Sequence, residues 1–299
     1  MDINLINVPL KYGSGKDGVD LAFEKMYQSG LLDLINNDKH QLANLIKIDV
    51  KNVLKQDKYK DSVNLNYLNI VSDVNEKLAK TVYQSLKDHK FPFVIGGDHS
   101  VAIGSIAGAS HYYKKLAVIY IDAHGDFNTT KTSPSHNIHG MPLAASMGLK
   151  DAPLTNVLYK GQKLNPKNLY HIGGRDFDEG EIDIIKKLNL DMYTMDIIED
   201  SGLNNILDEV IVKIKSQSYA GVHLSFDIDS LDAGLVPGTG YPVINGFTLE
   251  EIKLILSKFL HTGFVTSIDF VEYNPLLDDD SKITLKNSLT IIKYMLDSL

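Results

Sequence analysis

Three apolar runs that each end in a cluster of Asp and His residues constrain the fold of this chain most. They cover residues 91–95, 116–121 and 222–226, and are followed by GGDHS, DAHGDFN and DIDSLD. Such short runs, rich in β-branched and aromatic residues, are typical of strands buried on both faces of a parallel sheet. The carboxyl ends of parallel strands form the edge where open α/β sheets bind ligands. The acidic groups are therefore expected together at that edge.

Helical patterns between the apolar runs complete an α/β fold. Val74, Leu78, Val82 and Leu86 form a stripe at four-residue spacing, and Thr248 with Glu251 forms a capping-box pattern before a helix that stops near Gly263. This alternation predicts a parallel sheet covered on both faces, a three-layer α/β/α arrangement. No linker, repeat or shift in composition divides the 299 residues, so we expect a single domain over 1–299. About eight strands are expected, near residues 3–9, 46–50, 92–96, 116–121, 168–172, 190–194, 222–227 and 265–270.

The polar groups at the strand ends have the chemistry of metal ligands. Four carboxylates in one cleft repel one another, and a multivalent cation removes that repulsion. Six oxygen and nitrogen ligands without a thiolate argue against a structural zinc site and suit two ions that share bridging carboxylates. Manganese is the first choice for such oxygen-rich coordination, although affinity order alone favours other divalent ions. The six candidate ligands are His99, Asp122, His124, Asp126, Asp227 and Asp229.

Simpler roles exist for single members of this set. Asp98 and Ser100 could cap the helix after GGDHS, and Asp122 alone could be a phosphoryl acceptor in a flavodoxin-like fold. The D-x-H-x-D spacing that begins at Asp122, together with two further strand ends, favours the metal centre.

Composition excludes several other classes of function. The net charge is −8 and the basic residues are scattered, which argues against a nucleic-acid partner. The chain contains no cysteine, so disulfides and thiol chemistry are excluded. Its N-terminus has no basic segment, and no run of 18 apolar residues occurs, so we expect no membrane insertion and a cytoplasmic location.

The three runs resemble the signature motifs of the ureohydrolase family, and specifically those of bacterial arginases. The likeness extends from about Val8 to about Asp278 and is weakest between Leu31 and Leu68. It implies the three-layer fold and two Mn²⁺ ions bridged by Asp122 and Asp227. By position, one ion is bound by His99, Asp122, Asp126 and Asp227, and the other by Asp122, His124, Asp227 and Asp229.

The resemblance also implies roles for polar residues that, taken alone, fit surface loops or helix caps equally well. The loop at 129–142 matches the family segment that reads the substrate's α-carboxylate, and His139 matches its proton-shuttle histidine. Asp126 would also accept a hydrogen bond from the nucleophile, and Glu272 would hold the guanidinium group. The expected α-carboxylate contacts are Asn128, Ser135 and Asn137; the expected α-ammonium contact is Asp178, supported by Asp176 and Glu181.

These assignments predict an arginase, a hydrolase that converts L-arginine to L-ornithine and urea by attack of metal-bound hydroxide on the guanidinium carbon. The alternatives are agmatinase or another amidinohydrolase of the family, and a non-catalytic metal-binding relative. The family resemblance also suggests a homo-oligomer, a trimer or hexamer. Two residues depart from the family pattern: His136, expected to be a solvent-facing substitution, stands where relatives commonly have Gly, and Tyr241 where they usually have Thr.

Overall fold

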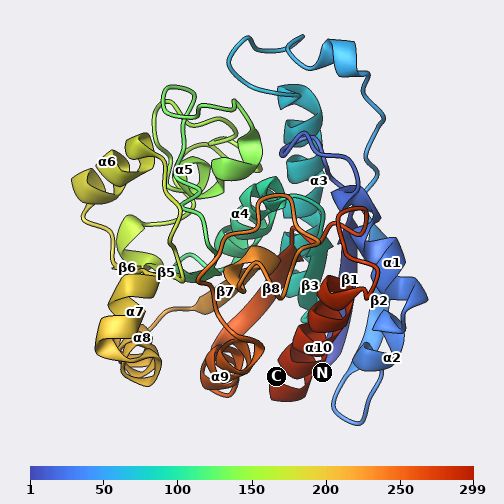
Figure 1. Cartoon of the computed structure of the whole chain (residues 1–299), viewed down its shortest axis with the longest axis vertical. Coiled ribbons are helices and arrows are strands. Elements are labelled where there is room, and N and C mark those ends of the chain that lie inside the picture. The colour runs from blue at the N-terminus through green and yellow to red at the C-terminus, as the bar shows by residue number, and fades with distance from the viewer.

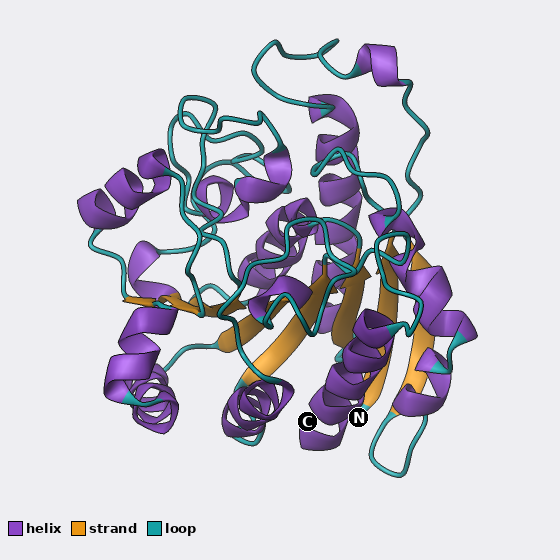
Figure 2. Ribbon diagram, viewed as in Figure 1, coloured by secondary structure: helices purple, strands orange, loops and turns teal.

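Eight parallel strands form one central sheet with helices on both faces, in a computed structural model that describes all 299 residues (Figures 1 and 2). The strand order is β2-β1-β3-β8-β7-β4-β5-β6. The predicted three-layer α/β/α fold is confirmed. The strands are β1 (Asp2–Val8), β2 (Gln41–Lys47), β3 (Phe91–Gly96), β4 (Leu116–Ile121), β5 (Leu169–Ile172), β6 (Met192–Tyr193), β7 (Gly221–Asp227) and β8 (Val265–Val271).

Ten helices cover the sheet and bury two separate apolar cores. The core on one face contains side chains of α1, α2, α7, α8, α9 and α10, and the core on the other contains those of α3, α4 and α5, with α6 packed against it. The helices are α1 (Ala22–Gln28), α2 (Leu31–Ile35), α3 (Leu68–Lys87), α4 (Ala102–Tyr112), α5 (Pro142–Ser146), α6 (Glu179–Leu188), α7 (Met195–Ser201), α8 (Leu203–Gln217), α9 (Leu249–Leu260) and α10 (Ile283–Ser298). None of them is long and apolar enough to cross a membrane.

The helices follow the sequence signals that predicted them. The stripe of Val74, Leu78, Val82 and Leu86 lies on the buried face of α3, and each of these side chains contributes roughly 1.5–3 kcal/mol by leaving water. Thr248 caps α9, and its capping box with Glu251 is present. The helix ends at Leu260, slightly before Gly263.

One predicted strand lies elsewhere. The apolar residues at 46–50 suggested a strand there, but β2 spans Gln41–Lys47 and pairs only with β1. It is an edge strand with no buried residue, so apolar content does not mark its position. The error leaves the site unaffected because three strands separate β2 from β7 and four separate it from β4.

The sheet order explains how distant motifs meet. Strands β3, β8, β7 and β4 are consecutive neighbours, although they are widely separated in the sequence. Because all of them run in the same direction, the segments that follow them lie along one edge. The three Asp and His clusters and Glu272 belong to these four segments.

Candidate metal centre and substrate cavity

Each candidate metal ligand stands at or just beyond the carboxyl end of a buried strand. His99 begins a short 3-10 turn, His99–Val101, after β3, and Asp98 caps that turn by accepting a hydrogen bond from the Ser100 amide. Asp98 therefore has the capping role considered for it, and it orients the neighbouring His99. Asp122 follows β4, while Asp227 ends β7 and caps the 3-10 turn Ile228–Ser230.

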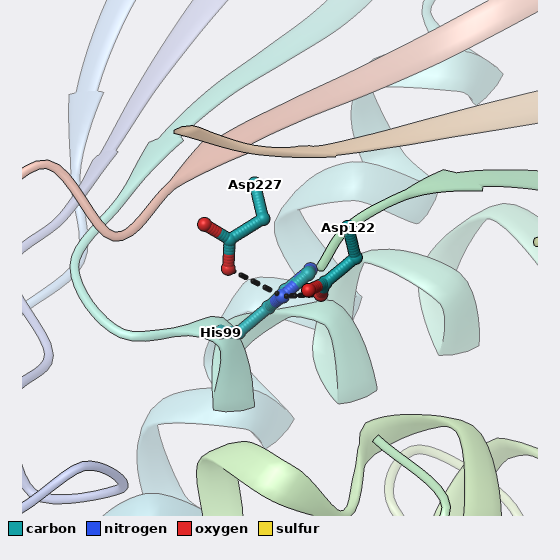
Figure 3. Close-up of side chains that lie close together, drawn as sticks. All are labelled: His99, Asp122 and Asp227. Atoms are coloured by element: carbon teal, nitrogen blue, oxygen red, sulfur yellow. Dashed lines mark ion pairs between the residues drawn. The ribbon is translucent and has the colours of Figure 1, made fainter. Parts of the chain in front are cut away.

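His99, Asp122 and Asp227 form a compact buried group (Figure 3). His99 Nδ1 lies 2.9 Å from Asp122 Oδ2, 3.0 Å from Asp227 Oδ2 and 3.3 Å from Asp126 Oδ2. Neither His99 Nδ1 nor Asp122 Oδ2 makes a hydrogen bond of acceptable geometry, although both atoms are buried. Buried polar atoms without hydrogen bonds need another partner, and a cation between them fits this donor set.

A second group shares Asp122 with the first. It consists of Asp122, His124 and Asp229. His124 Nδ1 lies 3.1 Å from Asp229 Oδ2 and 3.6 Å from Asp122 Oδ1. Since the two oxygens of Asp122 face different imidazoles, this carboxylate is placed to bridge two ions. Asp227 belongs to the first group and touches the second through a hydrogen bond of 2.9 Å from the Asp229 amide to Asp227 Oδ1.

The protonation of the ligands also favours a cation. Burial, reinforced by the charge of Asp229, raises the pKa of Asp227 well above its ordinary value, and burial raises the pKa of Asp126 to about 8. Burial alone would lower the pKa of His99, but Asp122 and Asp227 raise it well above its ordinary value. Without an ion, the site therefore retains protons in a confined space, and divalent cations would displace them.

A buried hydrogen-bonded chain fixes the orientation of His99. Its Nε2 lies 2.9 Å from Ser225 Oγ, and Ser225 Oγ donates to Asp269 Oδ1 at 2.5 Å. Because the serine proton is committed to Asp269, Nε2 of His99 must carry the donated proton, which leaves Nδ1 free to face the carboxylates. Asp269 also lies 2.9 Å from His223 Nε2 and accepts from Ser105 Oγ. These buried hydrogen bonds behind His99 were not predicted from the sequence.

A polar cavity of about 230 Å³ opens above the two groups. Of the predicted site residues, only Asp122 is absent from its lining, because it lies beneath the other ligands, 1% exposed. Tyr241 is the single hydrophobic residue among the 17 that line it. The predicted residues in the lining are His99, His124, Asp126, Asn128, Ser135, Asn137, His139, Asp176, Asp178, Glu181, Asp227, Asp229 and Glu272.

His139 and Glu272 form a pair beside the first group. His139 Nδ1 lies 3.2 Å from Glu272 Oε1, and the same oxygen accepts from the His99 amide at 2.8 Å. Burial alone would lower the pKa of His139, but its hydrogen bond with Glu272 raises it above the ordinary value. Both Glu272 (φ +65°) and Asp126 (φ +60°) have left-handed backbone conformations. Strain of this kind is typical of functional sites.

The residues expected to read a carboxylate lie along one side of the cavity. Asn128 Nδ2 donates to Asp178 Oδ2 at 2.8 Å, while its buried Oδ1 has no partner. Asn137 is anchored on both sides, since its Nδ2 donates to Ser14 O at 2.9 Å and its Oδ1 accepts from Asn66 at 2.5 Å. Ser135 Oγ accepts from the Asn137 amide at 3.2 Å and lies 3.5 Å from Ser133 Oγ, where either hydroxyl can donate. The Ser135 hydroxyl can turn to a ligand when Ser133 is the donor of that pair.

The three acidic residues expected near an ammonium group differ in their surroundings. Asp178 caps α6 in a capping box with Glu181. Glu181 is nearly buried and accepts from the amides of Phe127 at 2.8 Å and Asp178 at 2.9 Å. Burial raises the pKa of Glu181 to about 7. Asp176 lies 3.8 Å from His124 Nε2. Glu181 thus supports the loop, while Asp176 and Asp178 face the cavity.

His136 differs from the expectation of a solvent-facing side chain. It is half-buried, its Nδ1 is enclosed without a partner, and its backbone is left-handed at φ +60°. A glycine adopts this conformation without strain, which is the physical reason a Gly suits this position. His136 is not part of the cavity lining.

Other cavity residues were not predicted. Ser133, Pro134 and Gly140 line the cavity, and Tyr120 donates to Asp126 Oδ2 at 2.6 Å while stacking on the His99 ring at 4.6 Å. Tyr120 looked like an ordinary residue of an apolar strand. Its position two residues before Asp122, on the same side of the pleat, was the available signal.

Two groups of candidate ligands share a carboxylate at the carboxyl edge of a parallel sheet, and a polar cavity with a histidine–carboxylate pair lies above them. This arrangement defines a metal-dependent hydrolase. Comparison with known proteins gives the family. The sequence profile of the arginase family matches residues 1–297, and the chain belongs to this family.

Individual relatives agree with the family assignment. An arginase of Bacillus caldovelox is 40% identical over 280 residues, which cover 94% of this chain and 93% of that protein. An arginase of Bacillus subtilis strain 168 is 38% identical over 98% of this chain and 97% of its own length. A solved structure of the Bacillus caldovelox arginase superposes with a TM-score of 0.91 at 37% identity, covering 99% of this chain and 98% of the other.

Proposed function

We propose that this chain is an arginase that hydrolyses L-arginine to L-ornithine and urea at a dinuclear manganese centre. The observation that carries the proposal is the union, in one cavity, of two ligand groups joined by Asp122 with the His139–Glu272 pair. The identity of about 40% with the arginase of Bacillus caldovelox over nearly the whole chain supports it.

The proposed ligands fit two divalent ions that share carboxylates. The ions, when bound, acidify water and so supply a nucleophile near neutral pH. Manganese suits an oxygen-rich set of four carboxylates and two imidazoles without thiolate. We assign His99, Asp122, Asp126 and Asp227 to one ion, and Asp122, His124, Asp227 and Asp229 to the other.

Glu272 holds the guanidinium group in this proposal. Its Oε1 already accepts two hydrogen bonds, from His139 and from the His99 amide, so Oε2 is the oxygen available to the substrate. A guanidinium is planar and permanently charged, and a buried carboxylate orients it strongly. Glu272 is 3% exposed, which protects this contact from water.

In the proposed reaction, Asp126 accepts a hydrogen bond and His139 donates a proton. Asp126 accepts a hydrogen bond from the attacking water while Tyr120 holds its other side by donating to Oδ2. His139 delivers a proton to the departing nitrogen when the carbon–nitrogen bond to ornithine breaks. The Glu272 contact outweighs burial and raises the pKa of His139, which favours the protonated imidazole that this role needs.

Recognition of both charged groups of an amino acid favours L-arginine over agmatine, which lacks the α-carboxylate. The hydroxyl of Ser135 and the second amide proton of Asn137 suit a carboxylate. Asp178 and Asp176 suit the α-ammonium group. Asn128 links these two halves through its bond to Asp178, so it positions the ammonium contact.

Urea release from the manganese-loaded protein tests the assignment. L-Arginine and agmatine are supplied separately at equal concentrations. We expect urea from L-arginine and at least about a hundredfold less from agmatine, because a site that hydrogen-bonds a group rejects the analogue that lacks it. Urea from agmatine alone would identify an agmatinase, and no urea from any guanidino compound would favour the non-catalytic relative.

Two further properties rest on the sequence pattern, and a third, the oligomeric state, rests on family resemblance. We propose a cytoplasmic protein, a single folded domain over residues 1–299, and a homo-oligomer that is a trimer or hexamer. Cell fractionation, the number of unfolding transitions, and light scattering after gel filtration test them in turn.

A further inference from the structure

Tyr241 is the only Phe, Tyr or Trp side chain in an otherwise polar cavity. It belongs to the loop between β7 and α9, and 37% of its surface is exposed. Sixteen of the 17 lining residues are not hydrophobic, and many of them carry charge. A large ring at such a place reduces the volume open to a ligand without offering it a charge.

Lys16 holds the ring in place. The Lys16 ammonium lies 3.6 Å from the centroid of the Tyr241 ring, close enough for a cation–π contact. The same ammonium donates to the carbonyl of Gly240, the residue before the tyrosine. Lys16 comes from the loop after β1, so two segments far apart in the sequence restrain one side chain. The Tyr241 ring is therefore held in one position, where it bounds the cavity like a wall, and does not rotate freely.

The wall faces the end of the cavity assigned to the guanidinium group. The rings of Tyr241 and His139 lie 5.2 Å apart at 31°, and His139 is bonded to Glu272. The tyrosine ring also lies nearly perpendicular to the His124 ring, at 83°, with the ring centroids 6.3 Å apart. A Cβ built on Gly240 would lie 3.7 Å from Glu272 Oε2, so the backbone that carries Tyr241 also runs close to the free oxygen of Glu272.

We propose that Tyr241, held by Lys16, determines specificity for an unsubstituted guanidinium group. Its ring occupies the space that alkyl groups on the terminal nitrogens would need, so the site excludes arginines methylated there. The inference rests on the proposed arginase function and extends it to the boundary of the substrate class.

Competition by Nω,Nω-dimethyl-L-arginine tests the proposal. Ornithine release from L-arginine is measured with the manganese-loaded protein, and the ratio of the inhibition constant of the dimethyl compound to the KM of L-arginine gives the discrimination. We expect Tyr241→Ala to lower this ratio by about tenfold or more, since even one methylene in a pocket changes discrimination by about 10- to 200-fold. Lys16→Met should lower it by a smaller factor, because the ring remains but is released.

Two kinds of control separate shape from other effects. Tyr241→Phe retains the ring and should retain the ratio, which shows that volume and not the hydroxyl is responsible. Tyr59→Ala removes an exposed tyrosine that also has a lysine over its ring, Lys58 at 5.3 Å, but lies outside the cavity lining, and it should leave the ratio unchanged.

The outcomes are distinguishable. Wild-type hydrolysis of L-arginine with an equal ratio in Tyr241→Ala and wild type would overturn this inference alone. A ratio that falls equally in Tyr241→Phe would also overturn it, because the hydroxyl would then be the selective group. Absence of ornithine from L-arginine with the wild-type protein would instead refute the proposed function.

Discussion

Replacing Asp269 by Asn tests whether the buried chain behind His99 prepares the metal site. Asp269 is fully buried and accepts hydrogen bonds from Ser225 Oγ at 2.5 Å and from Ser105 Oγ, with His223 Nε2 2.9 Å away. An asparagine keeps the size of the side chain but replaces one acceptor oxygen by an NH₂ donor. One serine or the histidine must then lose its partner.

The structure sets the magnitude of this effect. Hydrogen bonds to a charged group contribute about 1.5–3 kcal/mol, and leaving a buried donor unpaired costs about 1–3 kcal/mol. We therefore expect Asp269→Asn to lower the free energy of unfolding by about 3 kcal/mol. Loss of a group that orients a metal-binding histidine typically weakens metal affinity by about 10- to 100-fold, and we expect a loss in this range.

Two measurements on the same variant check the prediction. Urea denaturation of the chelator-treated protein gives the change in stability, and titration of that protein with Mn²⁺ gives the affinity. Asp297→Asn, which changes an exposed carboxylate paired with Lys293, is the matched control and should alter neither by much. If Asp269→Asn loses stability but binds Mn²⁺ as tightly as the wild type, Asp269 is only a structural residue and the argument about His99 is refuted.

Four further predictions follow from the site and its surroundings. His139→Asn should keep both metal ions but lose most turnover at neutral pH, by about 10²-fold or more if the imidazole is the proton donor; unchanged kcat would remove His139 from the mechanism. Burial lowers the pKa of His171 to about 4, so its neutral form stabilises the fold above the unfolded pKa of about 6.5, and this contribution disappears as the pH falls from there towards 4. This shift in the pKa of His171 corresponds to about 3 kcal/mol. Between pH 7 and pH 4 the free energy of unfolding should therefore fall less in His171→Asn than in the wild type. Parallel plots of unfolding free energy against pH would contradict this. His136→Gly should raise the free energy of unfolding by up to about 1 kcal/mol, since it removes left-handed strain, and a lower melting temperature would count against the strain argument. Removing metal with a chelator should lower the melting temperature by several degrees, with full recovery on adding Mn²⁺, because ions that bind only the folded chain stabilise it; an unchanged melting temperature in scanning calorimetry of both forms would contradict this.

The fold was predictable because its strands are buried on both faces. Runs such as 116–121 are apolar throughout and were placed correctly, whereas β2 is an exposed edge strand and was placed several residues too late. The two-residue strand β6 forms mainly because β5 offers an edge for pairing, so its short extent follows from the sheet and not from its own residues.

The clustering of the candidate metal ligands was predictable for a different reason. A carboxylate at the end of an apolar run is conspicuous, and the D-x-H-x-D spacing places two carboxylates and an imidazole together without any knowledge of the tertiary structure. The roles of Asn137 and Glu181 depend on contacts with Ser14, Phe127 and other distant residues, which the sequence does not specify.

The hydrogen bonds from His99 through Ser225 to Asp269 were not predicted because they depend on the order of the strands in the sheet. Ser225 and Asp269 lie in register on β7 and β8, which are neighbours only because the chain inserts both strands between β3 and β4. A buried Asp in the middle of the apolar strand β8 was the available signal. Such a group needs partners, but their identity follows only from the sheet topology.

The central claim is that two ions, bridged by Asp122, support the hydrolysis of L-arginine. Its most direct test is to strip the protein of metal and follow urea release from L-arginine as Mn²⁺ is added back in known ratios to the chain. We expect activity to saturate at two ions per chain. Full activity at one ion per chain, or activity that is unaffected by removing the metal, would contradict it.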